Sequence, residues 1–386
     1  MKERAMTTPD WNAFRREMPI ADRFAYFDHA AVAPLPRRSA AALTRYATEA
    51  AELGDTIWPQ WAQRVEEVRR TAARLIAAEP SEIALVPNTT AGINLVAEGY
   101  PWQPGDNVVV PANEFPSNLF PWLNLASRGV EVRQVAPRGA ELSLDDLFAA
   151  VDDRTRIITV SWVGYATGWR IDIDELHERA HARGVLVFLD AIQGLGIFPL
   201  DVRRTDVDFL AADGHKWLLG PEGAGLFYIR QNLLDRLRPL NVGWHSVPKA
   251  HDFSQAKWSP KPEAQRYEGG SQNMAGMIAL GASLDLLVEY GAGPQATALS
   301  DRLLEVTTLA CEKLQSAGAR IVSDRSSRAH SANIVAFEMP GQESAEVRQR
   351  LWQRDVNLSV RHGWLRIAPH VYTNTDDLER LVSALA

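Results

Sequence analysis

Cysteine is nearly absent from this sequence, since Cys311 is the single one among 386 residues. An intrachain disulfide is therefore excluded, and the composition fits a reducing compartment. Apolar residues form no run that approaches the length of a membrane span. The first residues, MKERAMTTPDW, are charged and then polar, and they lack the apolar core of a secretory signal. We therefore expect a cytoplasmic location and no membrane partner.

An excess of positive charge is also lacking. Lys and Arg number 41 against 48 Asp and Glu, which gives a net charge of −7. This balance argues against nucleic acid as a partner. The length exceeds that of one average domain, and the 46% hydrophobic content is ordinary for a globular protein whose core can hold a buried site. We therefore expect two domains.

Short apolar runs alternate with amphipathic segments between residues 82 and 230. The runs are continuous in Val, Ile and Leu, which is typical of strands buried on both faces. A succession of strand, crossover helix and strand predicts an α/β fold with a mainly parallel sheet. The expected strands are 83–86, 107–110, 130–135, 156–161, 185–190, 207–212 and 225–229, and the expected helices are 60–78, 143–151 and 172–183.

The C-terminal third has a different pattern. Segment 239–270 is irregular and rich in Trp and His, so we interpret it as a long functional loop. Helices are expected at 273–290 and 295–318. Strands near 334–338 and 364–368 then indicate a small α+β unit.

Ligands of an open parallel sheet bind at the carboxyl ends of its strands, and four features of the sequence follow such ends. The first is PNTTAG at 87–92, after a strand and at the start of a helix. The hydroxyls of Thr89 and Thr90, with free backbone N–H groups at a helix start, suit a phosphate. Capping of that helix by one of the two threonines is the competing interpretation.

The second feature is Asp190, at the tip of a strongly apolar strand. A carboxylate in that position loses hydration unless it meets a cation, and a protonated pyridine ring would serve. Gln193, three residues later, is in a position to donate to a phenolic oxygen of the same ring. The alternative is an aspartate that caps the following turn.

The third and fourth features are Lys216, in the turn DGHKW at 213–217, and Arg366, in the apolar strand WLRIA at 364–368. A lysine in an apolar and aromatic setting is a candidate for a lowered pKa and for Schiff-base chemistry. A guanidinium on an apolar strand suits bidentate capture of a substrate carboxylate. A solvated lysine and a structural ion pair are the respective alternatives.

One motif suggests a different function, that of a zinc protease. Residues 177–181 spell HERAH, the H-E-x-x-H pattern of zinc proteases. The segment falls in an expected crossover helix, where no open cleft is available to a substrate. We interpret it as a solvated helix face and predict no metal site.

Together these residues resemble a known family, the class V aminotransferase group of fold-type I enzymes that use pyridoxal 5′-phosphate (PLP). The group includes cysteine desulfurases, selenocysteine lyases and isopenicillin N epimerase. The resemblance runs from about Tyr26 to near the C-terminus. It is carried by YFDHAAVAPLP (26–36), NTTAGINLVA (88–97), EFPSN (114–118), LDAIQ (189–193), GHKWLLGP (214–221), RYEGGSQN (266–273) and LRIAPHVYTN (365–374).

The resemblance implies a large PLP domain at 25–272 with a mainly parallel seven-stranded sheet. It also implies a small C-terminal α+β domain at 273–386, against which residues 1–24 pack. The expected unit is a homodimer with shared active sites, in which Ser271 reaches the phosphate of the neighbouring subunit's cofactor.

The resemblance also assigns roles to individual residues. Lys216 is expected to hold PLP as a Schiff base and then to shuttle protons, while Asp190 pairs with the pyridine nitrogen and Gln193 approaches the phenolic oxygen. Thr89, Thr90 and His215 are expected to bind the phosphate, where Asp213 replaces the family's usual Ser or Thr. The other expected contacts are a ring-stacking Phe115, Tyr165 near the ring, and substrate contacts from Arg366, His29 and Trp244.

The chain departs from the desulfurases in one respect that bears on the reaction. Desulfurases carry a persulfide-forming cysteine shortly before the equivalent of Arg366, but here segment 359–364, SVRHGW, has none. Cys311 lies in an expected amphipathic helix and is interpreted as a small core residue. We therefore expect an amino-acid substrate and favour a carbon–sulfur lyase that works by β-elimination without a persulfide. The alternatives are an aminotransferase, an epimerase or, more distantly, a catalytically silent PLP-binding regulator.

Overall fold

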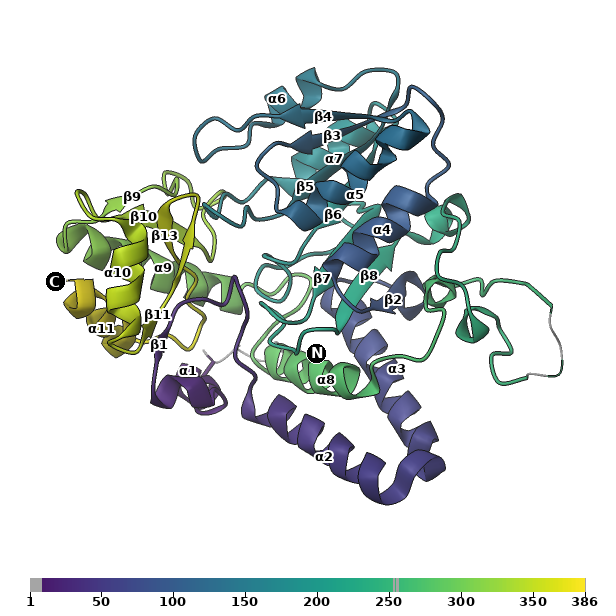
Figure 1. Ribbon diagram of the computed structural model, residues 1–386, viewed down its shortest axis with the longest axis horizontal. Coiled ribbons are helices and arrows are strands. Elements are labelled where there is room, and N and C mark those ends of the chain that lie inside the picture. Colours follow the sequence, from purple (N-terminus) through teal and green to yellow (C-terminus); the bar gives the residue numbers. More distant parts are fainter. Residues whose placement is uncertain (1–8, 253, 255–256, 386) are drawn as a thin grey trace, which may run out of the picture.

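The computed structural model of the chain describes residues 9–252, 254 and 257–385 (Figure 1). Its largest element is a seven-stranded sheet, in which every neighbouring pair is parallel except the two pairs made by β8. The predicted α/β fold with a mainly parallel sheet is thus confirmed. In spatial order the strands are β2 (Ile83–Val86), β8 (Gly225–Ile229), β7 (Phe209–Asp213), β6 (Leu186–Asp190), β5 (Thr155–Ser161), β3 (Asn107–Pro111) and β4 (Glu131–Val135).

Both faces of this sheet are covered, which explains why most of its strands read as continuous apolar runs. Along β6, Val187 and Leu189 enter one hydrophobic cluster while Phe188 enters the other. The expectation of two buried faces is wrong for β4, where only Val135 is buried. This strand lies at the edge of the sheet, and its Glu131 and Gln134 are exposed.

Helices lie on both sides of the sheet. Those predicted at 60–78, 143–151 and 172–183 are confirmed, with ends that shift by a few residues. The helices of this lobe are α2 (Arg37–Leu53), α3 (Trp58–Leu75), α4 (Thr89–Gly99), α5 (Phe120–Leu123), α6 (Leu144–Ala149), α7 (Ile173–His181) and α8 (Met274–Glu289). The sequence reasoning did not predict α2, although Ala42, Tyr46 and Ala50 recur every four residues and pack, partly buried, against the core.

The second lobe contains a four-stranded antiparallel sheet, at the left of Figure 1. Its strand order is β12 (Ser359–Arg361), β13 (Trp364–Ile367), β10 (Val335–Glu338) and β9 (Arg320–Ile321), and its helices are α9 (Ala298–Ser316), α10 (Ser344–Trp352) and α11 (Thr375–Leu385). A two-residue turn, His362 and Gly363, joins β12 to β13 with positive φ at both positions. Turns of this kind match the twist of the strands that they connect.

The beginning of the described chain contacts this second lobe. Strand β1 (Ala25–Tyr26) pairs with β11 (Val356–Asn357), and Arg15 of α1 (Trp11–Arg16) forms an ion pair of 2.6 Å with Asp377. Residues 1–8 of the expected N-terminal segment lie outside the described residues. Helix α8 packs against α2 and α3 (Figure 1). We therefore propose that β1 belongs with the small lobe and α8 with the large one.

The segment interpreted as a long loop, 239–270, is irregular apart from short 3₁₀ turns in its described part. Cys311 is buried in α9, within the core of the small lobe. Within the described part of the chain, no helix combines the length and the apolar character needed to cross a membrane.

A buried ion pair fixes the end of the long loop to the large lobe. Both side chains are only 1% exposed, and Arg69 of α3 donates to Glu268 at 2.5 and 3.0 Å. Arg69 also donates to the carbonyl of Ile83, and the backbone N–H of Leu85 donates to Glu268. The pair therefore ties α3, strand β2 and segment 268–273 together.

We predict that Arg69→Met lowers the free energy of unfolding by about 3–5 kcal/mol, because it leaves a carboxylate buried without its cation. Urea denaturation at pH 7 measures the change. Arg70→Met is the matched control, since Arg70 pairs with Glu67 at the exposed surface, where such pairs contribute at most about 1 kcal/mol. Equal losses in the two variants would contradict the prediction.

Candidate active site

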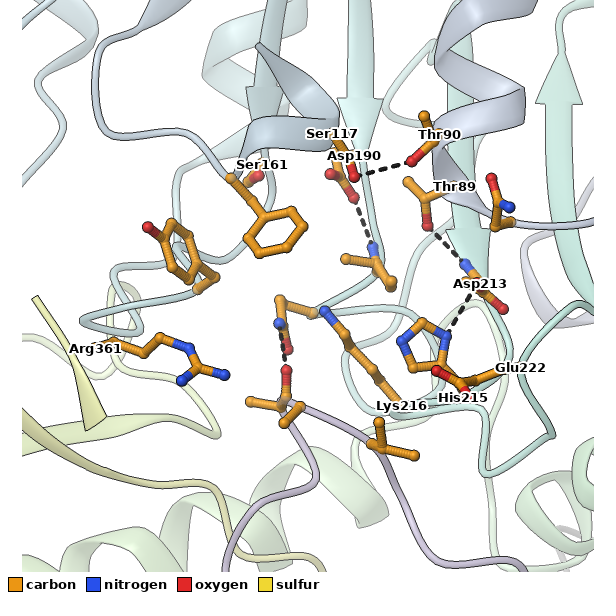
Figure 2. Close-up of a pocket in the computed structure, with 18 of the residues that line it drawn as sticks. Thr89, Thr90, Ser117, Ser161, Asp190, Asp213, His215, Lys216, Glu222 and Arg361 are labelled. Carbon is orange, nitrogen blue, oxygen red and sulfur yellow. Dashed lines mark hydrogen bonds and ion pairs between the residues drawn. The ribbon is translucent and has the colours of Figure 1, made fainter. Parts of the chain in front are cut away.

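A cavity of about 260 Å³ opens at the carboxyl ends of β5, β6 and β7 (Figure 2). Parallel strands place their carboxyl ends at one edge of a sheet, which is why residues distant in the sequence meet here. Ten of the residues predicted from the sequence line it or its floor: Thr89, Thr90, Phe115, Tyr165, Asp190, Gln193, Asp213, His215, Lys216 and Arg366. Residues 30–32 and Arg361 complete the wall on the side of the small lobe.

Lys216 lies in the turn that follows β7 and extends into the middle of this cavity (Figure 2). It is 8% exposed, and burial lowers the pKa of its ammonium group to about 8, although Asp190 and Asp213 oppose that shift. Its Nζ lies 5.5 Å from the centroid of the Phe115 ring. An amine that is partly neutral near neutral pH is able to attack a carbonyl carbon.

Asp190 ends β6 and is 2% exposed. Burial raises the pKa of its carboxyl group to about 6, partly offset by a hydrogen bond of 3.1 Å from the N–H of Ile192 and by the charge of Lys216. Among the described residues it forms no ion pair within 4.0 Å. A buried carboxylate without a cation of its own fits a protonated ring nitrogen.

The opposite end of the cavity gathers hydroxyls and an imidazole at the start of α4. Thr90 donates to Ser117 at 2.9 Å, and Thr89 accepts from the N–H of Asp213 at 2.9 Å. The Asp213 carboxylate lies 3.0 Å from Nδ1 of His215, while its Oδ1 is buried without a hydrogen-bond partner in the described structure. Hydroxyls and a helix N-terminus beside a histidine fit a phosphate group.

Two side chains frame the space where a planar ring fits. Phe115 keeps 41% of its surface exposed, and its ring meets that of Tyr165 edge to face, with centroids 5.3 Å apart. Gln193 is held by Trp217, which donates to its Oε1 at 2.7 Å, while its own Nε2 donates to the carbonyl of Ala30 at 3.0 Å. One amide hydrogen of Gln193 is left for a ligand.

Two arginines of the small lobe line the cavity, and they differ in how many hydrogen bonds they make to the protein. Arg366 is 1% exposed, and it donates to Ser359 Oγ at 3.0 Å, to the carbonyl of Tyr165 at 2.7 Å and to Asp28 at 3.0 Å. The structural ion pair considered from the sequence is therefore present, although Arg366 also lines the cavity.

Arg361, by contrast, has a single hydrogen bond among those of the described residues, to the carbonyl of Val360, and it extends toward Lys216 (Figure 2). Its guanidinium is thus the freer cation at this end of the cavity. The sequence reasoning did not select Arg361 as a site residue. Its place at the end of a short strand, directly before a turn, was the available signal.

Three predicted residues do not reach this cavity within one chain. Ser271 is exposed and lines a second cavity of about 540 Å³. Trp244 lies beside Trp58 and His245 on the long loop. His29 is fully buried behind the cavity wall, bonded to the carbonyl of Ala368 and to Tyr372, and burial lowers its pKa to about 4.

Glu114 is a buried carboxyl group that the sequence reasoning missed. It accepts from the N–H of Ser161 at 2.6 Å and from its hydroxyl at 2.5 Å, at the end of β5 beside Asp190. Burial, together with the charge of Asp190, raises the pKa of Glu114 to about 7 despite these hydrogen bonds. A glutamate in a loop gave no sequence signal for such an environment.

The HERAH segment lies on α7, away from the cavity. The interpretation of this segment as a solvated helix face is wrong for His177, which is buried and contacts the carbonyl of Ile173. His181 contacts Asp208 at 2.8 Å. Across the described ranges, no group of three or more His, Cys, Asp or Glu side chains is arranged to hold a metal ion.

The cavity can be tested for its fit to PLP. A lysine with a lowered pKa, an unpaired buried carboxylate, an open aromatic face and a hydroxyl-rich helix start match the aldehyde, ring nitrogen, ring face and phosphate of that cofactor in turn. The residues present therefore fit PLP.

Comparisons with known proteins agree with this chemistry. A sequence profile of the family described as aminotransferase class-V matches residues 25–374. A probable cysteine desulfurase of Methanothermobacter thermautotrophicus is 36% identical over 282 residues, which cover 72% of this chain and 70% of the relative. Isopenicillin N epimerase of Streptomyces clavuligerus is 30% identical over 397 residues, which cover 98% of both proteins.

Solved structures give the same picture. The cysteine desulfurase CsdA of Escherichia coli has a TM-score of 0.87 at 26% identity, with 98% of both chains covered. A variant of C-DES with glycine linked to its PLP cofactor has a TM-score of 0.88 at 22% identity, with 98% of this chain and 99% of that chain covered. At this lower identity the second likeness bears on the fold alone.

We predict opposite effects of Asp190→Asn on the free and cofactor-bound protein. The pKa of Asp190 is about 6 in the fold against 3.8 in a model peptide, so between pH 4 and 6 the folded state holds a proton that the unfolded state has lost. This group therefore opposes folding increasingly as the pH rises through that window, by about 3 kcal/mol above it. At pH 8 the free variant should be more stable than the wild type, whereas at pH 4 the two should agree.

The same substitution should weaken PLP binding at least tenfold, because a neutral amide does not stabilise a protonated ring nitrogen. Denaturation of the free protein at both pH values and titration of PLP by absorbance measure the two effects. Asp153→Asn, at an exposed position, is the control and should change neither quantity. Lower stability of the free Asp190 variant at pH 8 would refute this account of the site.

Proposed function

The chain belongs to the class-V aminotransferase family, and from that premise we propose that it is a PLP-dependent carbon–sulfur lyase that acts on an amino acid by β-elimination. No persulfide on a protein cysteine takes part. The observation that carries the proposal is a cavity with one amine, Lys216, at its centre and no cysteine among its lining residues. Cys311, the single cysteine of the sequence, is buried in α9.

In this proposal the residues of the cavity bind different parts of the cofactor. Thr89, Thr90 and His215 bind the phosphate, Phe115 covers the ring, and Asp190 holds its nitrogen in the protonated state. When bound, PLP supplies an electron sink for the carbanion formed at the substrate Cα. The protein supplies the orientation of the substrate and the proton transfers around it.

Lys216 would hold the cofactor through its amine, and once free it would be the base that accepts the Cα proton of the substrate. Its lowered pKa suits both tasks, because a neutral amine is required for each. Arg361 and Arg366 bind the substrate carboxylate from the small-lobe side. With the carboxylate and the amine held, the Cα–H bond stays near Lys216 and the Cβ substituent leaves.

An epimerase is the second candidate, favoured by the likeness to isopenicillin N epimerase over 98% of both chains. Epimerisation and transamination begin with the same proton removal by Lys216. They differ in where the proton returns, to the other face of Cα or to the cofactor carbon.

We predict that the PLP-loaded protein releases pyruvate and ammonia from β-chloro-L-alanine and from at least one S-substituted L-cysteine. The assay follows keto acid, pyridoxamine phosphate and D-amino acid in parallel, because these products separate elimination, transamination and epimerisation. Lys216→Ala should lose at least 10³-fold in kcat, since it lacks the base and the covalent link. Borohydride reduction of the loaded wild type should modify Lys216, as shown by peptide mass. D-amino acid or pyridoxamine phosphate without keto acid would refute the lyase proposal.

We further propose that two chains form a homodimer in which Ser271 of one reaches the phosphate end of the other's cavity. Ser271 is exposed and does not line the cavity of its own Lys216, so it is available to a second chain. The buried Arg69–Glu268 pair holds the segment before it in place.

We predict a solution mass of twice 42.8 kDa. Lys216→Ala and Ser271→Trp should each be inactive alone. After mixing and subunit exchange, about a quarter of the wild-type activity should return, because half of the dimers are mixed and each has one intact site. Light scattering and the pyruvate assay provide the two measurements. A monomeric mass, or no recovery despite demonstrated exchange, would exclude shared sites.

A further inference from the structure

A tyrosine–histidine contact joins the two lobes at the mouth of the active-site cavity. Tyr165 belongs to the loop after β5 and lines the cavity, and its hydroxyl lies 2.7 Å from Nε2 of His362. His362 is the exposed first residue of the turn between β12 and β13. Its imidazole is therefore open to solvent on one side and bonded to a cavity residue on the other.

The contact lies beside Arg361 and Arg366, the two arginines that we propose to bind the substrate carboxylate. Arg366 donates to the carbonyl of Tyr165 at 2.7 Å, and Arg361 directly precedes His362 in the chain. In Figure 2, Arg361 lies on the side of Lys216 opposite to Thr89 and His215. The hydroxyl of Tyr165 is thus near the guanidinium groups and away from the phosphate end.

Few groups at this end are able to give up a proton. The guanidinium groups of Arg361 and Arg366 stay protonated in proteins. Ser161 donates its hydroxyl to Glu114 at 2.5 Å, and Lys216 is occupied with the Cα proton. Among the described residues that line the substrate end, Tyr165 is the one whose hydroxyl has a titratable partner open to solvent.

We propose that Tyr165, supplied with protons by His362, is the general acid that protonates the sulfur leaving group. This inference rests on the proposed β-elimination and names the residues that complete it. Lys216 accepts the Cα proton, and the electron pair left at Cα forms a double bond between Cα and Cβ. The Cβ–S bond breaks at the same time, and its electron pair remains on sulfur. The Tyr165 hydroxyl gives its proton to that sulfur, which leaves as a thiol. Protonated His362 then returns a proton to the Tyr165 oxygen and is itself reprotonated by water.

The environment of Tyr165 explains why its hydroxyl needs a neighbouring proton donor. Its pKa is raised by burial and by the charge of Glu114, against the opposing effect of Arg361 and Arg366. A phenolate here is therefore unfavourable unless a proton is restored at once. The same 2.7 Å contact serves both directions, since Tyr165 donates to a neutral imidazole and accepts from a protonated one.

The experiment compares leaving groups that differ in their need for a proton. The variants are Tyr165→Phe and His362→Asn, the latter because asparagine tolerates the positive φ of 50° at this turn. The substrates are β-chloro-L-alanine, whose chloride leaves without a proton, and the S-substituted L-cysteine that the wild type eliminates fastest. We expect kcat to fall about 10²-fold with the thioether substrate and less than threefold with β-chloro-L-alanine.

Two further measurements isolate the other steps. Exchange of the Cα proton of L-alanine in D₂O, which requires Lys216 and no leaving group, should remain within threefold of the wild type. The affinity for PLP, titrated by absorbance on the free protein, should also remain unchanged. His330→Asn is the control, because His330 bonds to Arg170 at 2.9 Å across the lobes without lining the cavity.

Equal losses with both substrates, or the same leaving-group dependence in His330→Asn, would overturn the inference and leave the contact with a structural role. Loss of Cα exchange would overturn it as well, because the pair would then act at Cα. A wild type that eliminates neither substrate would remove the proposed function and this inference with it. Elimination by the wild type without a leaving-group effect in the variants would remove this inference alone.

Discussion

Lys216 and Asp190 are buried together at the carboxyl ends of neighbouring strands, and neither forms an ion pair with another described residue. Burial acts on the two groups in opposite directions: it lowers the pKa of the amine and raises that of the carboxyl. Both pKa shifts arise because burial removes the hydration of the charged groups. The free protein does not fully replace that hydration with hydrogen bonds or ion pairs. A cofactor with an aldehyde for the amine and a ring nitrogen for the carboxylate relieves both at once. The rest of the cavity is arranged around this pair.

Hydrogen bonds between the lobes bring the arginines of the small lobe to the cavity of the large lobe, where the cofactor and the substrate are expected to meet. The loop after β5 carries Tyr165 from the large lobe to Arg366 of the small one, and Ser323 donates to the carbonyl of Thr167 in the same loop. The Gln193 carbonyl accepts from Asn333. In each contact a side chain of the small lobe donates to a backbone carbonyl of the large lobe, so the rotamers of Arg366, Ser323 and Asn333 help to set the relative position of the lobes.

Sequence reasoning was most successful where one segment decides the outcome. Strands β2 and β8 were predicted with their observed bounds, because continuous apolar runs between turn residues are a local signal. The positions of Asp190 and Lys216 followed from the strands predicted at 185–190 and 207–212, since each residue lies at or just after a carboxyl end. Helix α2 was missed although Ala42, Tyr46 and Ala50 recur at helical spacing, because alanine supplies most of its apolar face.

The remaining site residues depend on contacts between distant segments. Tyr165 and His362 are 197 positions apart, and no pattern in either segment reveals their hydrogen bond. Arg366 was selected from the sequence because of its apolar strand and Arg361 was not, but only the contact of Arg366 with Asp28 shows that Arg361 is the freer cation. His29 stands in a motif shared with relatives, yet its side chain faces Tyr372 in the core. Resemblance identifies a position, whereas packing decides which way its side chain points.

The two-residue turn between β12 and β13 is a position where insertions should be tolerated. Hairpin ends tolerate insertions, because they lie at the surface and carry few hydrogen bonds of the sheet. A lengthened turn would carry different side chains to the cavity mouth and leave Lys216, Asp190 and the phosphate end intact. Members of one family can then diverge in reaction by insertion and deletion at a single loop, while the cofactor chemistry is inherited unchanged.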